Sequence, residues 1–180
     1  MTNAVESVQI NEQINSDGNN AALVKLDSAN NTTIIGAKFE VNCSNSDSND
    51  TPSAIVPINF LETPSFSWSR STIITFKDVD IYIRCKKNSK FSFEPRLFEA
   101  RFYQYKQNQH LGRNFTDFRL DNIRIHFDDP ELAAQYDDAY WSKENQFKLS
   151  KYDTLDLKSA DLTVISGGNS KRYIYATSPE

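Results

Sequence analysis

Few side chains in this sequence of 180 residues are suited to chemistry, and they are scattered. His110 and His126 are the only histidines. A protein zinc site needs several histidine, cysteine or carboxylate ligands close together, and neither histidine has such neighbours in the sequence. We expect both to be surface residues, and we expect the protein to bind no metal and no other cofactor.

Two adjacent carboxylate pairs, Asp128-Asp129 and Asp137-Asp138, are the nearest approach to an acid–base site. Such catalysis needs two carboxylates in different environments across a cleft, which neighbouring residues on one solvated face do not provide. Gly167-Gly168 lacks the following helix that a phosphate-binding loop requires. Asp47–Thr51 begins like a calcium loop, but Pro52 stands where its sharp turn needs glycine. We therefore predict that the protein is not an enzyme.

The two cysteines, Cys43 and Cys85, each continue the apolar alternation of an expected strand. The first twenty residues carry no lysine or arginine, so we expect no secretory signal and a location in the cytoplasm or in an assembled particle. In such a reducing setting both cysteines are predicted to be small buried thiols. A disulfide remains the alternative if their strands are neighbours.

The candidate binding residues lie mainly in a basic, aromatic segment, residues 84–105. Proteins that bind single-stranded nucleic acid combine cations, which follow the phosphates, with rings that stack on the bases. The alternative, which we favour, is that the phenylalanines alternate into the core and the lysines mark a hairpin loop. The candidates for a binding surface are Trp68, Lys86, Lys87, Lys90, Phe91, Phe93, Arg96 and Arg101.

Charge is segregated along the chain, although the net charge is only −4. Residues 1–83 hold 4 basic and 10 acidic side chains, residues 84–124 hold 10 and 4, and residues 125–180 hold 6 and 10. A pI near 5.3 argues against a bulk nucleic-acid binder. The favoured interpretation is that strands of opposite charge pair and neutralise one another, and the alternative is a basic face that meets an anionic partner.

Apolar residues recur at every second position along much of the chain, which is typical of β-strands with one buried face. The alternation is clear in Ile35–Cys43, Ala54–Phe60 and Ala160–Val164. The polar stretch Ser166–Ser170, which contains two adjacent glycines, separates the last of these from another β-prone run. Two such runs around a short glycine turn predict a β-hairpin.

Two central segments share a change of parity in their apolar pattern. The change occurs at Lys77-Asp78 in the first segment and at Asp121-Asn122 in the second. Because a one-residue slip would turn every apolar side chain to the wrong face, each change requires a bulge, bend or tight turn. Corresponding positions lie about 44 residues apart, which would fit an internal duplication, but alternating strands also match by chance and we favour chance.

One segment has the signals of a helix. Asp129 is suited to the N-cap position and Pro130 to the first helical position. Leu132, Tyr136 and Tyr140 then follow with helical spacing. We expect one short α-helix near residues 130–142, packed over a sheet or over the open end of a sandwich.

These elements predict an all-β fold with mainly antiparallel strands, a β-sandwich of jelly-roll type. Residues 1–21 are polar without a sustained period, so we expect a flexible N-terminal arm followed by a single β-sandwich domain over residues 22–180. Aromatic residues make up 12% of the chain, enough to fill a core. No apolar run is long enough to span a membrane.

The leading functional hypothesis is a non-catalytic structural or interaction protein, a subunit of a virion or another large particle. It rests on the polar arm and on the segregated charge, which would let acidic and basic faces of neighbours meet. A carbohydrate-binding module of jelly-roll type, with Trp68 as a stacking platform, is the alternative. Single-stranded nucleic-acid binding through residues 84–105 is third. We expect a protein partner or self-assembly in preference to a glycan or a nucleic acid.

Overall fold

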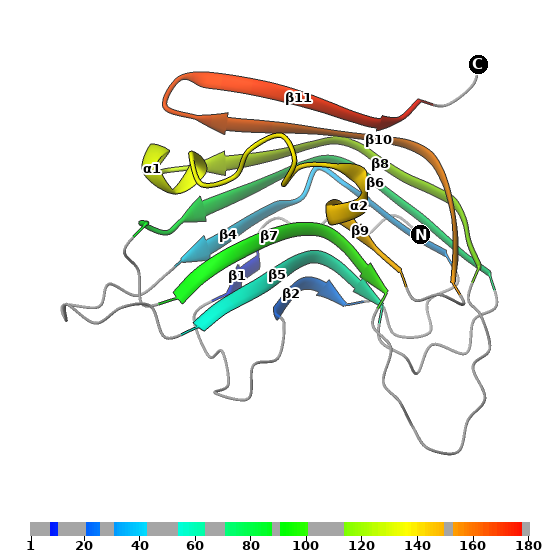
Figure 1. The fold of residues 1–180 in the computed structure, drawn as a ribbon. Coiled ribbons are helices and arrows are strands. Elements are labelled where there is room, and N and C mark those ends of the chain that lie inside the picture. The colour runs from blue at the N-terminus through cyan, green and yellow to red at the C-terminus, as the bar shows by residue number, and fades with distance from the viewer. Residues whose placement is uncertain are drawn as a thin grey trace.

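The protein folds into two layers of β-strands (Figure 1). The computed structural model describes residues 8–10, 21–25, 31–42, 54–63, 71–87, 91–100, 114–149 and 153–177. Of the expected N-terminal arm, the description therefore covers only the short strand at residues 8–10 and the first residue of the next strand. The division into an arm and a single domain stays a prediction.

The smaller layer, sheet B, is entirely parallel and has the strand order β2-β5-β7-β9. Its strands are β2 (Ala21–Lys25), β5 (Ala54–Thr63), β7 (Phe91–Ala100) and β9 (Phe147–Lys148). β7 thus lies within the basic, aromatic segment of the sequence.

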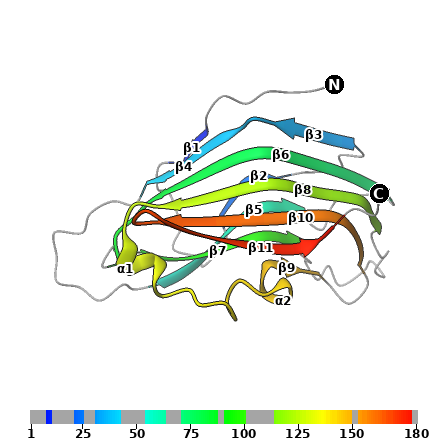
Figure 2. The same cartoon turned by 90° about the horizontal axis from the view of Figure 1, so that it is seen from above.

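The larger layer, sheet A, has the strand order β1-β4-β6-β8-β10-β11, and β3 also pairs with β6. Its strands are β1 (Val8–Ile10), β3 (Asn31–Ile35), β4 (Lys38–Asn42), β6 (Ser71–Arg84), β8 (Asn114–Phe127), β10 (Thr154–Ser166) and β11 (Asn169–Ala176). Every pairing is parallel except the one between β10 and β11. The sheet is mixed, with one antiparallel strand at its border (Figure 2).

The prediction of a mainly antiparallel jelly-roll sandwich is wrong. The chain alternates between the layers, so that each coil contributes one strand to sheet B and the next to sheet A, parallel to the strand one coil earlier. This is the architecture of a β-solenoid, in which each repeat contacts its neighbours. Val79 lies beside Ile123 and Ile81 beside Ile125, an offset of 44 residues. The spacing that we attributed to chance is thus the length of the coil between β6 and β8.

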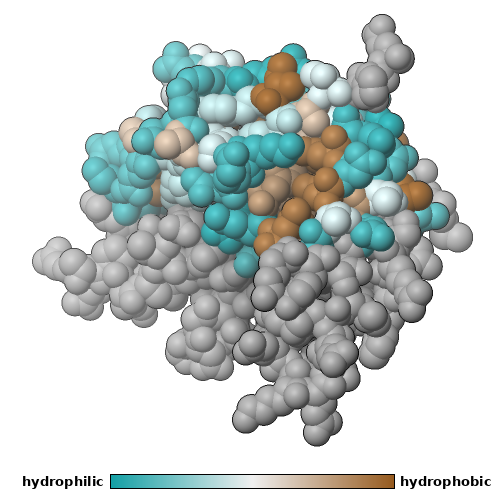
Figure 3. Space-filling model, turned by 45° about the vertical axis from the view of Figure 1, so that its right-hand side comes forward, coloured by the Kyte–Doolittle hydropathy of each residue, from teal (hydrophilic) through white to brown (hydrophobic). Residues whose placement is uncertain are grey.

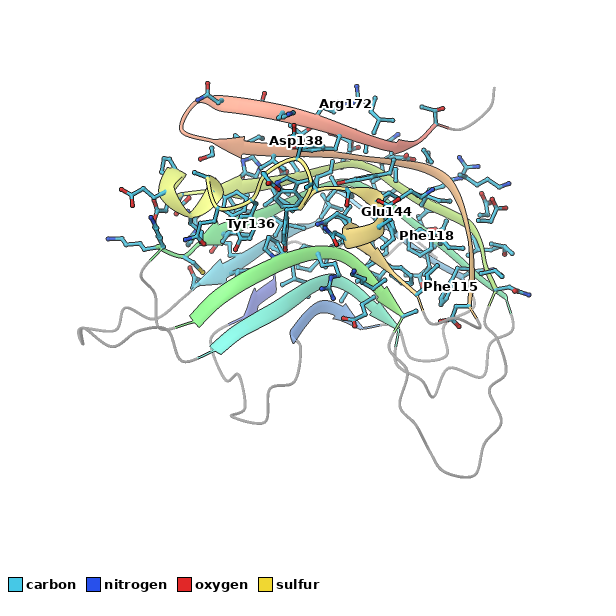
Figure 4. All side chains as sticks on the ribbon, in the orientation of Figure 1. Phe115, Phe118, Tyr136, Asp138, Glu144 and Arg172 are labelled. Carbon is cyan, nitrogen blue, oxygen red and sulfur yellow. The ribbon has the colours of Figure 1, made fainter. Side chains whose placement is uncertain are left out.

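The core lies between the two sheets and is rich in phenylalanine. Phe60 of sheet B meets Phe39 and Phe76 of sheet A with ring centroids 5.7 and 5.0 Å apart. One coil further on, Phe98 of sheet B meets Phe118 of sheet A at 4.9 Å, and Phe118 and its neighbour Phe115 come from β8 (Figure 4). Edge-to-face ring pairs stabilise beyond the area that they bury, so each coil is tied across the sheets by rings.

The predicted change of parity is confirmed at both positions and has a single structural cause. Gly36, Asp78 and Asn122 all have positive φ values, of 74°, 56° and 53°. They occupy equivalent positions in three successive coils, because each stands between the last inward residue before the bend and the first one after it. Asn122 donates its side-chain amide to the Asp78 carboxylate at 2.8 Å. Gly, Asn and Asp tolerate this left-handed conformation best. The first coil has glycine at this position, and the next two coils have Asp78 and Asn122 there.

The predicted hairpin is also confirmed. β10 and β11 are antiparallel and are joined by Gly167-Gly168, both with positive φ. A Cβ at Gly167 would lie 3.4 Å from Cγ of Pro130, an ordinary van der Waals contact. The turn therefore favours glycine for its left-handed backbone geometry.

The expected helix over residues 130–142 is shorter than predicted. Helix α1 (Pro130–Ala133) begins as expected, with the Asp129 carboxylate accepting the backbone N–H of Glu131. It ends after one turn, and a separate short helix α2 (Lys143–Gln146) follows. Asp137 caps the next turn by accepting the N–H of Tyr140 at 2.9 Å, because aspartate competes with helical hydrogen bonding in this way.

Cys85 is buried, as expected, but it is disulfide-bonded and is not a thiol. A disulfide was the alternative if the strands of the two cysteines were neighbours, and β4 and β6 are neighbours in sheet A. Cys43, the only other cysteine of the chain, lies outside the described residues. Over those residues, the structure contains no helix with the length and apolar character to cross a lipid bilayer.

Candidate interaction surface on sheet A

The outer face of sheet A carries rows of aligned charges, because alternation turns every second side chain outward and the parallel register stacks equivalent positions. We call this set the charged ladder. It contains Lys38, Glu40, Asp80, Tyr82, Arg84, Arg124, His126 and Asp128.

Asp80 is the centre of the charged ladder. It accepts Arg124 Nε at 2.6 Å and Arg124 Nη2 at 2.7 Å, a bidentate pair, and contacts His126 Nε2 at 2.8 Å. The hydrogen bonds from Arg124 lower the pKa of Asp80 to about 2, against the opposing effect of burial and with a further contribution from His126. The Asp80 side chain is 25% exposed, so the pair is shielded on its outer side only in part.

Arg84 joins three coils. It donates to Glu40 on the preceding coil and to Asp128 on the following one, each at 3.1 Å. These hydrogen bonds, with Glu40 first, raise the pKa of Arg84, and the bond from Arg84 lowers the pKa of Glu40. Tyr82 stacks on His126 with centroids 4.2 Å apart.

The charged ladder explains the segregated charge of the sequence. Glu40 and Asp80 come from the first acidic block, Arg84 and Arg124 from the basic block, and Asp128 from the second acidic block. The favoured interpretation, that strands of opposite charge neutralise one another, is therefore confirmed at these positions. His126 lies on the outer face as predicted, but it is bound within the ladder.

The sequence-predicted binding residues do not come together as one described surface. Lys86 and Lys87 are exposed, and Lys87 is tied to the helix start through its N–H, 2.8 Å from the Asp129 carboxylate. Arg96 is mostly buried and pairs with Glu99 at 3.3 Å. Trp68, Lys90 and Arg101 lie outside the described residues, as do the side chains of Phe91 and Phe93, whose backbones belong to β7.

The end of the stack beside β11 is closed by residues 128–149, which we call the C-terminal cap (Figure 2). Trp141 is its buried centre and meets Phe127, Tyr140 and Tyr173. Gln146 is buried too, and its amide accepts the N–H of Leu97 and donates to the carbonyl of Tyr140. The cap covers the phenylalanine-rich interior where the coils stop, as the end of a solenoid requires.

β11 faces the cap with one side and solvent with the other. Tyr173 and Tyr175 turn toward the cap, where the Tyr175 hydroxyl donates to the carbonyl of Trp141 at 2.8 Å. Burial, followed by the contact with Asp138, raises the pKa of Tyr173 to about 12. On the opposite side, Ile174 is 58% exposed, the highest value among the exposed large apolar residues of the described chain.

The two cations of β11 are held by their own chain. Lys171 Nζ lies 2.6 Å from Asp138 in the cap, and Arg172 Nε lies 3.3 Å from Asp161 on β10. Figure 4 labels Asp138, which belongs to the cap, and Arg172, which belongs to β11. Charged side chains on an edge strand usually discourage pairing with another chain. Here each cation has an acidic partner, but both side chains are largely exposed, so their charge is offset only in part.

The backbone geometry leaves hydrogen-bonding groups of β11 directed outward. A two-residue turn makes Ser166 and Asn169 a doubly hydrogen-bonded pair, and bonded and non-bonded pairs then alternate along an antiparallel ladder. In the observed register Arg172 and Ile174 fall in the non-bonded pairs, and a bulge follows directly after Ile174, where Tyr175 has no opposed residue on β10. Up to this bulge the N–H and C=O groups of the non-bonded pairs point away from β10, where the described part of the chain places no further strand.

Sequence reasoning did not find this surface. The hairpin was predicted, but nothing in the alternation of Lys171–Ala176 indicates that this strand ends a sheet. Within the described residues, no group of three or more histidine, cysteine or acidic side chains could hold a metal ion.

The strand edge and the charged ladder have no counterpart to guide their interpretation. No protein family, no curated protein and no solved structure matches the chain.

Proposed function

We propose that the protein is a non-catalytic interaction protein, a β-solenoid subunit of an assembly that forms through the outer edge of β11. The observation that carries the proposal is the combination of outward N–H and C=O groups at Arg172 and Ile174 with the exposed side chain of Ile174. Strand addition to an exposed edge is a general mode of protein recognition, in which main-chain hydrogen bonds supply affinity.

The charged ladder is less suited to docking. Its cations and carboxylates already bind one another, so a partner would have to replace contacts that exist. The faces of Tyr82 are also occupied, by His126 and by the nearby cations Lys38 and Arg84. The β11 edge, in contrast, offers backbone groups that gain a protein partner without losing one.

A photocrosslinking experiment tests the proposal. A photoreactive amino acid is placed at position 174, and at position 73 as a control, because Ile73 is an exposed isoleucine on β6 within the same sheet. We expect a crosslinked protein band from position 174 in the native source, with a much weaker one from position 73. Equal crosslinking at both positions, or none at position 174, would contradict docking through β11.

A further inference from the structure

The outer edge of β11 is suited to one occupant in particular. We propose that a second copy of this chain binds there, with the two β11 strands antiparallel around a two-fold axis that passes between the two Tyr173 residues. The inference rests on the proposed function, since it names the partner of the same edge.

The first argument is the symmetry of the strand. In an antiparallel pair of identical strands, residues whose backbone groups point outward must face one another. These residues occur at every second position, so the midpoint between any two of them is itself a residue. The two-fold axis therefore passes at a residue and not between two residues. Arg172 and Ile174 are the central outward residues of β11. An axis at Tyr173, midway between them, lets both residues bond the second copy.

The second argument is charge. An axis at Tyr173 places Arg172 of each copy opposite Ile174 of the other, so the aliphatic part of the arginine side chain can pack on the isoleucine. An axis at Arg172 would instead place two guanidinium groups opposite each other, and directly opposed like charges destabilise a sheet. Lys171 is opposite Tyr175 of the second copy, so no two cations of the strands face each other.

The third argument is closure. The pairing of β11 with β10 is the only antiparallel one in the described sheet. A further coil would add a strand parallel to β10, but β11 runs in the opposite direction and occupies that edge. An isologous pair uses the edge of each copy once and stops there, whereas a head-to-tail contact would continue into a fibre. Figure 3 shows brown apolar areas within a largely teal and white surface on the side that it views. A two-fold pair would cover Ile174, whose side chain is exposed.

The interface is small, because it is centred on a single strand of eight residues. Small interfaces are typical of transient complexes, and we expect a dissociation constant on the order of 10 to 100 μM. Sedimentation of the purified chain should therefore extend to about 1 mM. A monomer at all these concentrations would overturn the second-copy proposal.

Charge substitutions at one position test the axis. Ile174→Lys places an ammonium group opposite Arg172 of the second copy and should weaken the dimer about tenfold or more. Ile174→Glu places a carboxylate opposite the same arginine and should preserve or strengthen it. If the axis passed through Ile174, like charges would face each other in both variants. Equal weakening by lysine and glutamate would therefore contradict an axis at Tyr173.

Cysteine crosslinking gives an independent readout. A mixture of Arg172→Cys and Ile174→Cys chains, carrying different tags, should form mixed disulfide dimers, since opposed Cα atoms in a bonded pair lie about 5.5 Å apart. Dimers from Ile174→Cys alone would contradict the proposed register.

Failure of the inference differs from failure of the proposed function. If the purified chain is a monomer while the photoreactive residue at position 174 captures a different protein, the docking edge stands and the second-copy proposal falls. If position 174 captures nothing, both fall.

Discussion

The charged ladder and the β11 edge belong to the same sheet, yet one is closed and the other is open. Arg84, inside the stack, binds Glu40 on one neighbouring coil and Asp128 on the other. Arg172, in the last strand, has a described neighbour on one side only, Asp161 of β10. In a solenoid each repeat contacts only its neighbours. Inner strands therefore satisfy one another, whereas terminal strands need a cap or a partner.

The largest loss of stability should follow from removal of the centre of the C-terminal cap. We expect Trp141→Ala to lower the free energy of unfolding by about 3 to 5 kcal/mol, because the buried indole is lost and a cavity remains. Urea denaturation measures the change. Lys143→Ala, on the exposed side of α2, is the control and should have little effect. A loss below about 1 kcal/mol for the tryptophan variant would mean that the cap does not stabilise the end of the stack.

The next largest effect should come from the centre of the charged ladder. We expect Asp80→Ala to lower the free energy of unfolding by about 1 to 2 kcal/mol, because Arg124 and His126 lose their shared acceptor in a partly shielded site. The control is Asp156→Ala, which breaks an isolated exposed pair with Lys158. It should cost less than about 0.5 kcal/mol. Similar losses for the two variants would argue that the ladder gives no added stability.

Acidic solution should reduce the contribution of the same carboxylate. The pKa of Asp80 is lowered from 3.8 to about 2 in the folded protein. Its ionised form therefore stabilises the fold above pH 4, and this contribution, about 1 kcal/mol after allowance for solvent screening, is lost as the pH falls towards 2. The difference in unfolding free energy between the natural chain and Asp80→Asn should shrink over this interval. A constant difference from pH 5 to pH 2 would exclude this assignment.

The smallest effect on stability should come from the open edge. We expect Ile174→Lys to change the free energy of unfolding of the monomer by less than about 0.5 kcal/mol, because the side chain is largely exposed. Thermal unfolding of a dilute sample, below the concentration of dimer formation, measures it. A loss comparable with that of Asp80→Ala would show that Ile174 supports its own chain and is not kept for a partner.

The local elements could be predicted because each depends on a few neighbouring residues. The inward positions Phe39 and Val41 follow from alternation alone, and both are buried in β4. An irregularity at Asp78 and at Asn122 follows from the change of parity, since an unbroken strand would turn one half away from the core, and the structure shows that it is a left-handed residue. The turn at Gly167-Gly168 and the cap at Asp129 follow from the backbone preferences of those residues.

The direction of strand pairing could not be predicted in the same way. A strand with one buried face has the same alternation whether its neighbour is parallel or antiparallel. The relevant signal was the 44-residue offset between the segments around Asp78 and Asn122, because a recurring offset is the mark of stacked repeats. The coils nevertheless differ in length, since the offset is 42 residues from Lys38 to Asp80. The cysteines illustrate the same limit, as Cys85 is disulfide-bonded where the expected reducing setting favoured a thiol.

Residue type and short spacing account for which side chains avoid water, where the strands bend and where the last hairpin turns. The parallel stacking of the coils, the contact of Asp80 with Arg124 and the place of β11 as the last described strand of sheet A depend on the folded arrangement. These contacts join residues far apart in the chain. Whether a backbone group finds a partner depends on which strand lies beside it, and alternation carries no information about that neighbour.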